Sequence, residues 1–154
     1  MLVKNTWKLA VLAGVSVVGF SASLAFASAD DSIKARQECM KAHGASMGVM
    51  VPMIKGEKPY DNAAIQASFA AEEAACADWA KWWGADTQKG ETIETFAKPE
   101  IWTDAAGFEA AGGVWYKAYQ TIKATTDEAS FKAAFPALGE SCKGCHEKFR
   151  RPKG

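Results

Sequence analysis

DEASFKAAFPALGESCKGCHEKFR, residues 127–150, carries its apolar and sulfur-bearing side chains at intervals of three and four. These residues are Phe131, Phe135, Leu138, Cys142, Cys145 and Phe149. The spacing places all of them on one face of a helix, and Asp127 is a residue type favoured at a helix N-cap. We therefore predict a helix over this stretch, with a bend or an interruption near Pro136.

Three further stretches show the same period. They are residues 32–54, 63–83 and 104–124. The turn between the first two contains Gly56 and Pro59, and Asp61 follows it as an N-cap. Residues 84–102 keep no period, so we predict a long connection there. No stretch of the sequence alternates as a strand does, and two short-loop hairpins with one long crossing predict an all-α, antiparallel four-helix bundle.

The last predicted helix ends with the motif Cys142-Lys143-Gly144-Cys145-His146. In a C-x-x-C-H motif the two thiols add to the vinyl groups of a haem, and the imidazole reaches the iron. Cys142 lies three residues before Cys145 and four before His146, so one porphyrin beside the helix can satisfy all three. We predict one covalent haem c held by Cys142 and Cys145, with His146 as an axial ligand of its iron.

Other chemistry for these cysteines fits less well. A C-x-x-C redox pair is expected near the start of an α/β domain, whereas this pair lies near the end of a helical chain. A zinc site needs further Cys or His ligands at suitable spacing, and the only other histidine is His43. A structural disulfide would not require the histidine that follows.

The beginning of the chain, residues 1–29, has the composition of an export signal. A basic start with Lys4 and Lys8 is followed by a long apolar run and then by small residues. This order is that of a secretory signal peptide, and the alternative is an uncleaved membrane anchor, because the run approaches spanning length. We predict cleavage after Ala29, which leaves residues 30–154 as one periplasmic domain that does not insert into the membrane.

The charge of the predicted mature chain is close to balanced. The sequence has 18 Lys and Arg residues and 18 Asp and Glu residues. Without Lys4 and Lys8, 16 basic residues remain against 18 acidic ones, a formal charge of −2. Because the sequence has no basic patch or tail, we expect no nucleic-acid partner.

A haem motif at the end of a small helical chain resembles the class II cytochromes c, which comprise cytochrome c′ and its low-spin relatives. The resemblance covers essentially the whole mature chain. It includes Arg36-Gln37 with Met40-Lys41, residues 55–61, residues 98–102 and residues 142–150. It implies a four-helix bundle and a haem protein that is not an enzyme. A peroxidase would need a distal acid–base group, for which the inner face of the first helix offers only His43.

The resemblance also implies which residues lie on the other face of the haem. In this family the first helix covers that face, and the residue four positions after the Arg of Arg-Gln points at the iron. That residue is Met40, so Arg36 lies one helical turn away, where it could pair with a haem propionate. Gln37 belongs to the same haem-binding set. We expect His43 to be a neutral or solvated helix residue rather than a ligand.

Two functions follow from the two possible roles of Met40. If its sulfur bonds the iron opposite His146, the haem is six-coordinate, low-spin and of raised reduction potential, and the protein carries electrons. If Met40 only packs over the iron, the haem is five-coordinate and high-spin, and nitric oxide or carbon monoxide can bind as in cytochrome c′. From the sequence we favour the electron carrier, with an unidentified periplasmic redox partner, and the gas-binding protein is the alternative.

Two cysteines lie outside the motif. Cys39 is about eighteen residues before the centre of the first turn and Cys76 about eighteen after it, so an antiparallel hairpin places them at nearly the same height. A disulfide in an oxidising compartment and two small buried thiols are both open. Gly44 and Gly48 would let another backbone approach closely, either inside the bundle or across a homodimer, which the resemblance implies to be common.

Overall fold

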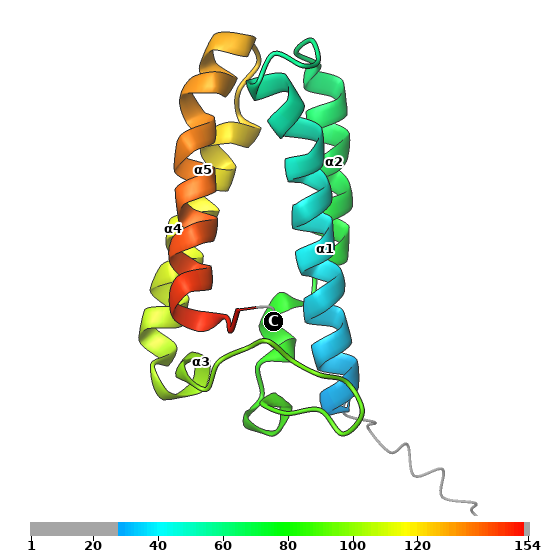
Figure 1. Ribbon diagram of the computed structural model, residues 1–154, viewed down its shortest axis with the longest axis vertical. Coiled ribbons are helices and arrows are strands. Elements are labelled where there is room, and N and C mark those ends of the chain that lie inside the picture. The colour runs from blue at the N-terminus through cyan, green and yellow to red at the C-terminus, as the bar shows by residue number, and fades with distance from the viewer. Residues whose placement is uncertain (1–27, 153–154) are drawn as a thin grey trace, which may run out of the picture.

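The computed structural model describes residues 28–152, which form mainly four long helices (Figure 1). They are α1 (Ala29–Ile54), α2 (Asn62–Ala75), α4 (Ala105–Lys123) and α5 (Glu128–Phe149). The connection from α2 to α4 holds the short helix α3 (Glu100–Thr103) and the 3₁₀ turns η1 (Trp79–Trp82) and η2 (Ala85–Thr87). The predicted all-α fold is confirmed. Of the predicted signal peptide, residues 1–27 lie outside the described part, whereas Ser28 and Ala29 begin α1.

Each long helix begins at a side chain that caps its first backbone N–H groups. Ser28 caps α1 in a reciprocal capping box with Asp31, whose N–H donates to Ser28 Oγ at 3.1 Å. Asp61, Asp104 and Asp127 cap α2, α4 and α5 through bonds of 3.0, 3.0 and 2.9 Å. The two caps predicted from the sequence, Asp61 and Asp127, are therefore confirmed.

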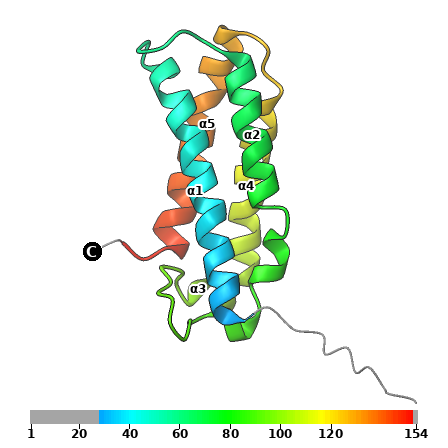
Figure 2. The same ribbon diagram turned by 90° about the vertical axis from the view of Figure 1, so that its right-hand side faces the viewer.

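The long helices form two hairpins that face each other (Figures 1 and 2). α1 packs against α2, and α4 packs against α5. The turn after α1 uses Gly56, whose φ of 72° lies in the left-handed region that glycine adopts at low cost. The backbone N–H groups of Glu57 and Lys58 donate to the Pro52 carbonyl at 2.8 and 3.2 Å, so the end of α1 is closed by its own turn.

The connection from α2 to α4 crosses one end of the bundle and is tied to the C-terminal segment (Figure 1). The Lys98 N–H donates to the Phe149 carbonyl at 3.0 Å, and the Arg151 N–H donates to the Phe96 carbonyl at 2.7 Å. These bonds form an isolated antiparallel bridge. The residues that follow the C-x-x-C-H motif thus hold the connection in place.

The structure differs from the sequence prediction at the end of the second helix and in having no interruption at Pro136. The second helix ends at Ala75 rather than near residue 83. A disulfide joins Cys76 to α1, and the chain then turns so that the aromatic side chains that follow can pack together. α5 is not interrupted at Pro136. The carbonyl of Lys132, which loses its usual N–H partner there, belongs to an exposed residue and can bond water.

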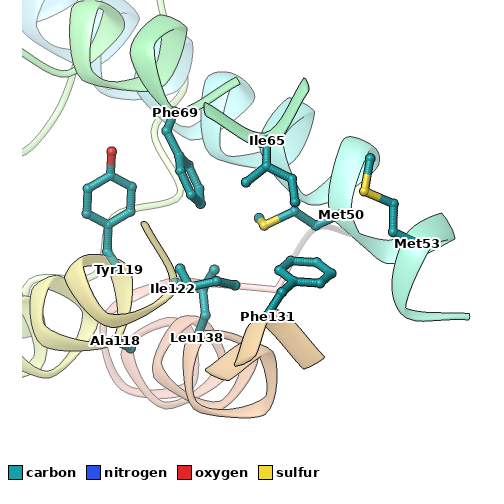
Figure 3. Packing of buried hydrophobic residues seen from close by; sticks show 9 residues of the cluster. All are labelled: Met50, Met53, Ile65, Phe69, Ala118, Tyr119, Ile122, Phe131 and Leu138. Atoms are coloured by element: carbon teal, nitrogen blue, oxygen red, sulfur yellow. The ribbon is translucent and has the colours of Figure 1, made fainter. Parts of the chain in front are cut away.

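The apolar core lies at the end of the bundle that holds the two hairpin turns, and Figure 3 shows how its side chains pack together. Its members come from all four long helices and are buried. They are Met50, Met53, Ile65, Phe69, Ala118, Tyr119, Ile122, Phe131 and Leu138. Burying a large apolar side chain stabilises the fold by about 2 kcal/mol. The core takes the second half of α1 and the first half of α5, so the C-x-x-C-H motif falls toward the opposite end. None of the helices within the described range is long and apolar enough to cross a membrane.

Candidate haem site

The last turns of α5 carry the motif residues on one side of the helix. Cys142 and Cys145 are half-buried free thiols, and His146 is more exposed. The motif shares the inner face of α5 with Leu138 and Phe149, which are buried. The structure therefore brings the three predicted attachment residues together in the order that one porphyrin requires.

The surroundings of the motif change the acid–base properties of its members. Burial raises the pKa of the Cys142 thiol and of the Cys145 thiol. Partial burial, together with the positive charges of Arg150 and His43, lowers the pKa of His146. A lowered pKa favours the neutral imidazole, which is the form that binds a metal ion. The lowered pKa of His146 is therefore compatible with the predicted role of an axial ligand.

Met40 lies on the inner face of α1, one turn after Arg36. Arg36 is 5% exposed and Ile33, on the same face, is 1% exposed, whereas Met40 is 37% exposed. Of these three residues, Met40 is therefore the one whose side chain is least covered by protein atoms. Such a side chain suits contact with a prosthetic group, either as a ligand or as a cover.

Arg36 is a buried cation with uncharged protein partners. Its Nη2 donates to the Thr87 carbonyl at 2.5 Å and its Nε to the Ser32 carbonyl at 3.3 Å. The guanidinium lies 4.6 Å from the centre of the Trp83 ring and 5.7 Å from that of Trp102. Desolvation by burial lowers the pKa of Arg36 to about 10, so the charged form has lost stabilisation that an anion would restore.

One hydrogen-bonding atom of this guanidinium is unused. Within residues 28–152, Arg36 Nη1 is buried and has no hydrogen-bond acceptor. A buried donor without an acceptor is rare in native proteins, and a carboxylate matches both its geometry and its charge. The residues present therefore fit a haem, whose propionate would supply this carboxylate. When bound, haem supplies an iron centre that can exchange an electron or take a small gas ligand.

Gln37 lies next to the buried face of α1 and holds the long connection. Its Nε2 donates to the Glu94 carbonyl at 2.8 Å. Asp30, two turns earlier, accepts from the backbone N–H groups of Glu91 and Thr92 at 2.9 and 3.0 Å. The first half of α1 thus fixes the connection that also carries the Thr87 carbonyl.

The sequence predicts a neutral or solvated helix residue at His43, and the structure contradicts the solvated alternative because the side chain is mostly buried. Its Nδ1 lies 2.8 Å from Glu72 Oε1, and the two side chains are 20% and 5% exposed. Its Nε2 lies 3.5 Å from Cys39 Sγ and 3.7 Å from Cys76 Sγ. Sequence reasoning missed Glu72, although its position four residues before Cys76 places both on one face of α2.

The two cysteines outside the motif are joined. Cys39 and Cys76 form a disulfide with a Cα–Cα distance of 5.0 Å, so the alternative of two buried thiols does not hold. The bond uses both sulfur atoms, and of the Cys39–His43–Cys76 group the imidazole alone keeps a free ligand atom. This group is therefore a cross-link between α1 and α2 rather than a metal centre.

The position of two tryptophans beside Arg36 does not follow from the sequence pattern. Trp83 and Trp102 lie in the long connection, where no helical period places side chains relative to α1. Trp83 packs against Trp79 and Phe108, with ring centres 4.7 Å apart in each case. The cluster of tryptophans after α2 was the sequence feature that could have indicated an aromatic contact. By itself it does not indicate that Arg36 is the residue contacted.

A C-x-x-C-H motif on the last helix of an antiparallel four-helix bundle defines a class II cytochrome c. The model of the family described as Cytochrome C′ matches residues 31–150. A cytochrome c′ from Alcaligenes xylosoxydans xylosoxydans is 34% identical over 132 residues, which cover 83% of this chain and 99% of that protein. A cytochrome c-556 from Rhodopseudomonas palustris is 33% identical over 94% of this chain and 97% of that protein.

Solved structures agree with this likeness. The cytochrome c′ of Rubrivivax gelatinosus superimposes with a TM-score of 0.73 at 32% identity, covering 82% of this chain and 99% of that chain. The nitric oxide complex of a leucine-to-alanine mutant of Alcaligenes xylosoxidans cytochrome c′ gives 0.71 at 32% identity, covering 83% and 99%. The chain belongs to the cytochrome c′ family, which carries covalent haem c.

Proposed function

We propose that the protein is a periplasmic cytochrome c′ whose five-coordinate haem binds nitric oxide or carbon monoxide on the face covered by Met40. Cys142 and Cys145 form the thioether links, and His146 is the axial ligand. The observation that carries this choice is the likeness to proteins named cytochrome c′, one of which has a solved structure described as a nitric oxide complex. The gas-binding function thus takes precedence over the electron carrier that the sequence alone favoured.

Met40 supports this function as a movable cover. It is unbranched, it follows the buried Arg36 by one turn on the same face of α1, and it is 37% exposed. An unbranched thioether has several accessible rotamers, so it can give way to a diatomic ligand without movement of α1. Its size would still exclude larger molecules and bulk water from the iron.

Arg36 and Gln37 have different parts in this proposal. Arg36 pairs with a haem propionate through its unused Nη1, and this contact fixes the porphyrin against α1. Gln37 acts indirectly, since its amide bonds the Glu94 carbonyl and so holds the connection over the site. Substitution of Arg36 should therefore change the haem environment directly, whereas substitution of Gln37 should change the position of the connection between α2 and α4.

A second candidate is the low-spin electron carrier, in which Met40 ligates the iron. It is supported by the methionine at the position that faces the iron in the family and by the likeness to a cytochrome c-556. In this case His146 and Met40 fill both axial positions, and the protein exchanges electrons with a periplasmic partner.

Absorption spectra separate the two candidates. A five-coordinate haem gives high-spin bands in the oxidised protein and rapid carbon monoxide binding in the reduced one. A His/Met haem instead gives a sulfur-to-iron absorption band at about 695 nm. We expect Met40→Ala to keep the high-spin spectrum and to bind carbon monoxide several-fold faster. Met47→Ala is the matched control, since Met47 lies two helical turns after Met40 on α1. This variant should bind carbon monoxide at the wild-type rate. A 695 nm band that Met40→Ala abolishes would reject the gas-binding proposal.

The export and haem parts of the proposal are tested by mass. Protein purified from the periplasm should have the mass of the processed polypeptide plus one haem. N-terminal sequencing places the processing site relative to Ser28, the cap of α1. A colourless product with the bare polypeptide mass would contradict the haem function altogether.

A further inference from the structure

Three buried side-chain atoms have no hydrogen-bond partner within residues 28–152, namely Arg36 Nη1, Trp83 Nε1 and Tyr60 Oη. Tyr60 belongs to the core end of the bundle, where its ring centre lies 5.6 Å from that of Phe131. The other two atoms belong to adjacent groups, because the Arg36 guanidinium lies 4.6 Å from the centre of the Trp83 ring. Two unpaired donors are therefore neighbours in one place.

Unpaired buried donors of this kind need an explanation, because they are rare in native proteins and destabilise the fold. Guanidinium and indole groups only donate, so these two cannot satisfy each other. The adjacent Trp102 shows the contrast, since its Nε1 donates to the carbonyls of Trp83 and Gly84 at 3.0 and 3.1 Å. Arg36 and Trp83 together require an acceptor with two free lone pairs and a negative charge.

The two donors lie at the haem end of the molecule. The Trp83 ring is 4.7 Å from that of Phe108, which is 5.3 Å from that of Phe149. Phe149 follows His146 by three residues on α5, and Arg36 brings the facing helix α1 to the same place. The donor pair thus stands between the helix that carries the haem motif and the helix that covers the other face.

We propose that Trp83 is a haem-binding residue, whose indole N–H donates together with the Nη1–H of Arg36 to one propionate carboxylate of the haem. The assignment rests on the proposed haem attachment at Cys142 and Cys145. A carboxylate has lone pairs for both donors, and the bond to Arg36 is charge-assisted. Trp83 adds a neutral donor at a fixed angle, so it sets the orientation of the carboxylate on Arg36.

Trp83 has one other use for its N–H. Its ring stands edge-on to the rings of Trp79 and Phe108, at an interplanar angle of 63° in both cases. This arrangement allows an N–H···π contact, which is weak and involves no haem. An indole used in this way would respond to changes at Phe108 and not to changes at Arg36.

The test uses the haem-loaded protein and the propionate bands of its resonance Raman spectrum. We expect Trp83→Phe to shift the propionate bending bands, as Arg36→Lys does. Trp102→Phe removes an indole N–H that already has backbone acceptors, so it should leave these bands at their wild-type positions. Wild-type bands in haem-loaded Trp83→Phe, with a shift in Arg36→Lys, would overturn the role of Trp83 alone. Protein without haem would overturn the proposed function as well.

A second measurement follows the indole itself. In ¹⁵N-labelled protein that is reduced and saturated with carbon monoxide, so that the haem is low-spin and diamagnetic, the Trp83 indole signal is identified by its loss in Trp83→Phe. Donation to a carboxylate places this signal downfield of solvent-exposed indoles and makes the downfield shift depend on Arg36. The shift should shrink in Arg36→Lys and persist in Phe108→Leu. The reverse result would identify an N–H···π contact and reject the inference.

Discussion

The Glu72 carboxylate is 4% exposed, and a buried carboxylate is costly unless a partner compensates it. Its ion-pair partner is the His43 imidazole at 2.8 Å. The Nε2 of the same imidazole faces the two disulfide sulfur atoms, and its ring packs edge-on against Trp115 with the centres 5.0 Å apart. His43 is therefore held on three sides, which makes its side chain part of the α1–α2 contact.

Replacing His43 should expose the cost of burying Glu72. In His43→Leu the carboxylate loses its partner, so we expect the free energy of unfolding in urea to fall by about 3 kcal/mol. The double variant His43→Leu/Glu72→Leu removes the uncompensated charge and should lose less than the single variant. Equal losses of unfolding free energy in the single and double variants would show that His43 stabilises the fold through packing of its imidazole rather than through its pairing with Glu72.

Single residues also show what the sequence can and cannot predict. The pairing of Arg36 with a propionate follows from family likeness and the one-turn spacing to Met40, and the unused Nη1 fits it. The stacking of Arg36 on Trp83 could not be predicted in this way, because Trp83 lies in a connection without a period. A helical period fixes neighbours on one helix, whereas a contact between helix and connection depends on the path of the chain.

Among the secondary-structure elements, α1 and α2 are joined by a turn, by packing and by the disulfide, which spans a sequence separation of 37. Closing a loop of this length removes conformational entropy from the unfolded chain. We expect Cys39→Ala/Cys76→Ala to lower the free energy of unfolding by about 4 kcal/mol. The urea midpoint of the wild type should fall on reduction, and that of the double variant should not respond. A wild type that is indifferent to reductant would contradict this.

α2 and α4 are joined on the surface by the Glu73 carboxylate, which accepts from Tyr119 Oη at 3.0 Å and pairs with Lys123. The hydrogen bond from Lys123, followed by that from Tyr119, lowers the pKa of Glu73. A carboxyl group whose pKa is lower in the folded state stabilises the fold at pH values above its ordinary, unfolded-state pKa. This stabilisation is lost as the pH falls through the lower, folded-state pKa. Below about pH 4, the urea midpoint should therefore fall more steeply in the wild type than in Glu73→Gln.

The elements themselves were predictable to the extent that their signals are local. Asp61 and Asp127 mark helix starts because a cap needs only its own next three residues. The equal heights of Cys39 and Cys76 follow from one turn and a fixed rise per residue. The early end of α2 could not be predicted, since a continued helical period beyond Ala75 competes with a cross-link and an aromatic cluster that involve distant parts of the chain.

The whole molecule has two unlike ends, with an apolar core near the hairpin turns and the haem motif near the crossing connection (Figures 1 and 3). The fold class was predictable because two hairpins, one long crossing and a terminal C-x-x-C-H motif leave few arrangements. The face used for self-association was not. Gly44 and Gly48 are exposed, and, apart from the adjacent residues and the backbone of their own helix turns, no atom of the described chain lies within 4 Å of a Cβ built on either. They therefore make no close backbone contact inside the bundle.

Of the two uses that the sequence suggested for these glycines, a contact across a homodimer is the one that remains to be tested. If the homodimer that the sequence suggested forms there, Gly48→Leu should shift sedimentation toward the monomer. The single chain has space for the side chain and gains helix propensity, so its thermal stability should not fall. Gly139→Leu on α5, where an added Cβ also meets nothing, is the control. A dimer unaffected by Gly48→Leu would place the interface on another face.

The bridge between the crossing connection and the C-terminal segment restricts how the protein can be handled. If the predicted signal peptide is removed on export, an affinity tag has to follow the other terminus. Arg151 is already engaged in the ladder with Phe96, only three residues before the end of the chain. A tag needs a spacer after Gly154, since a fusion that ends the chain before Arg151 would remove the backbone N–H that bonds the Phe96 carbonyl and holds the long connection in place.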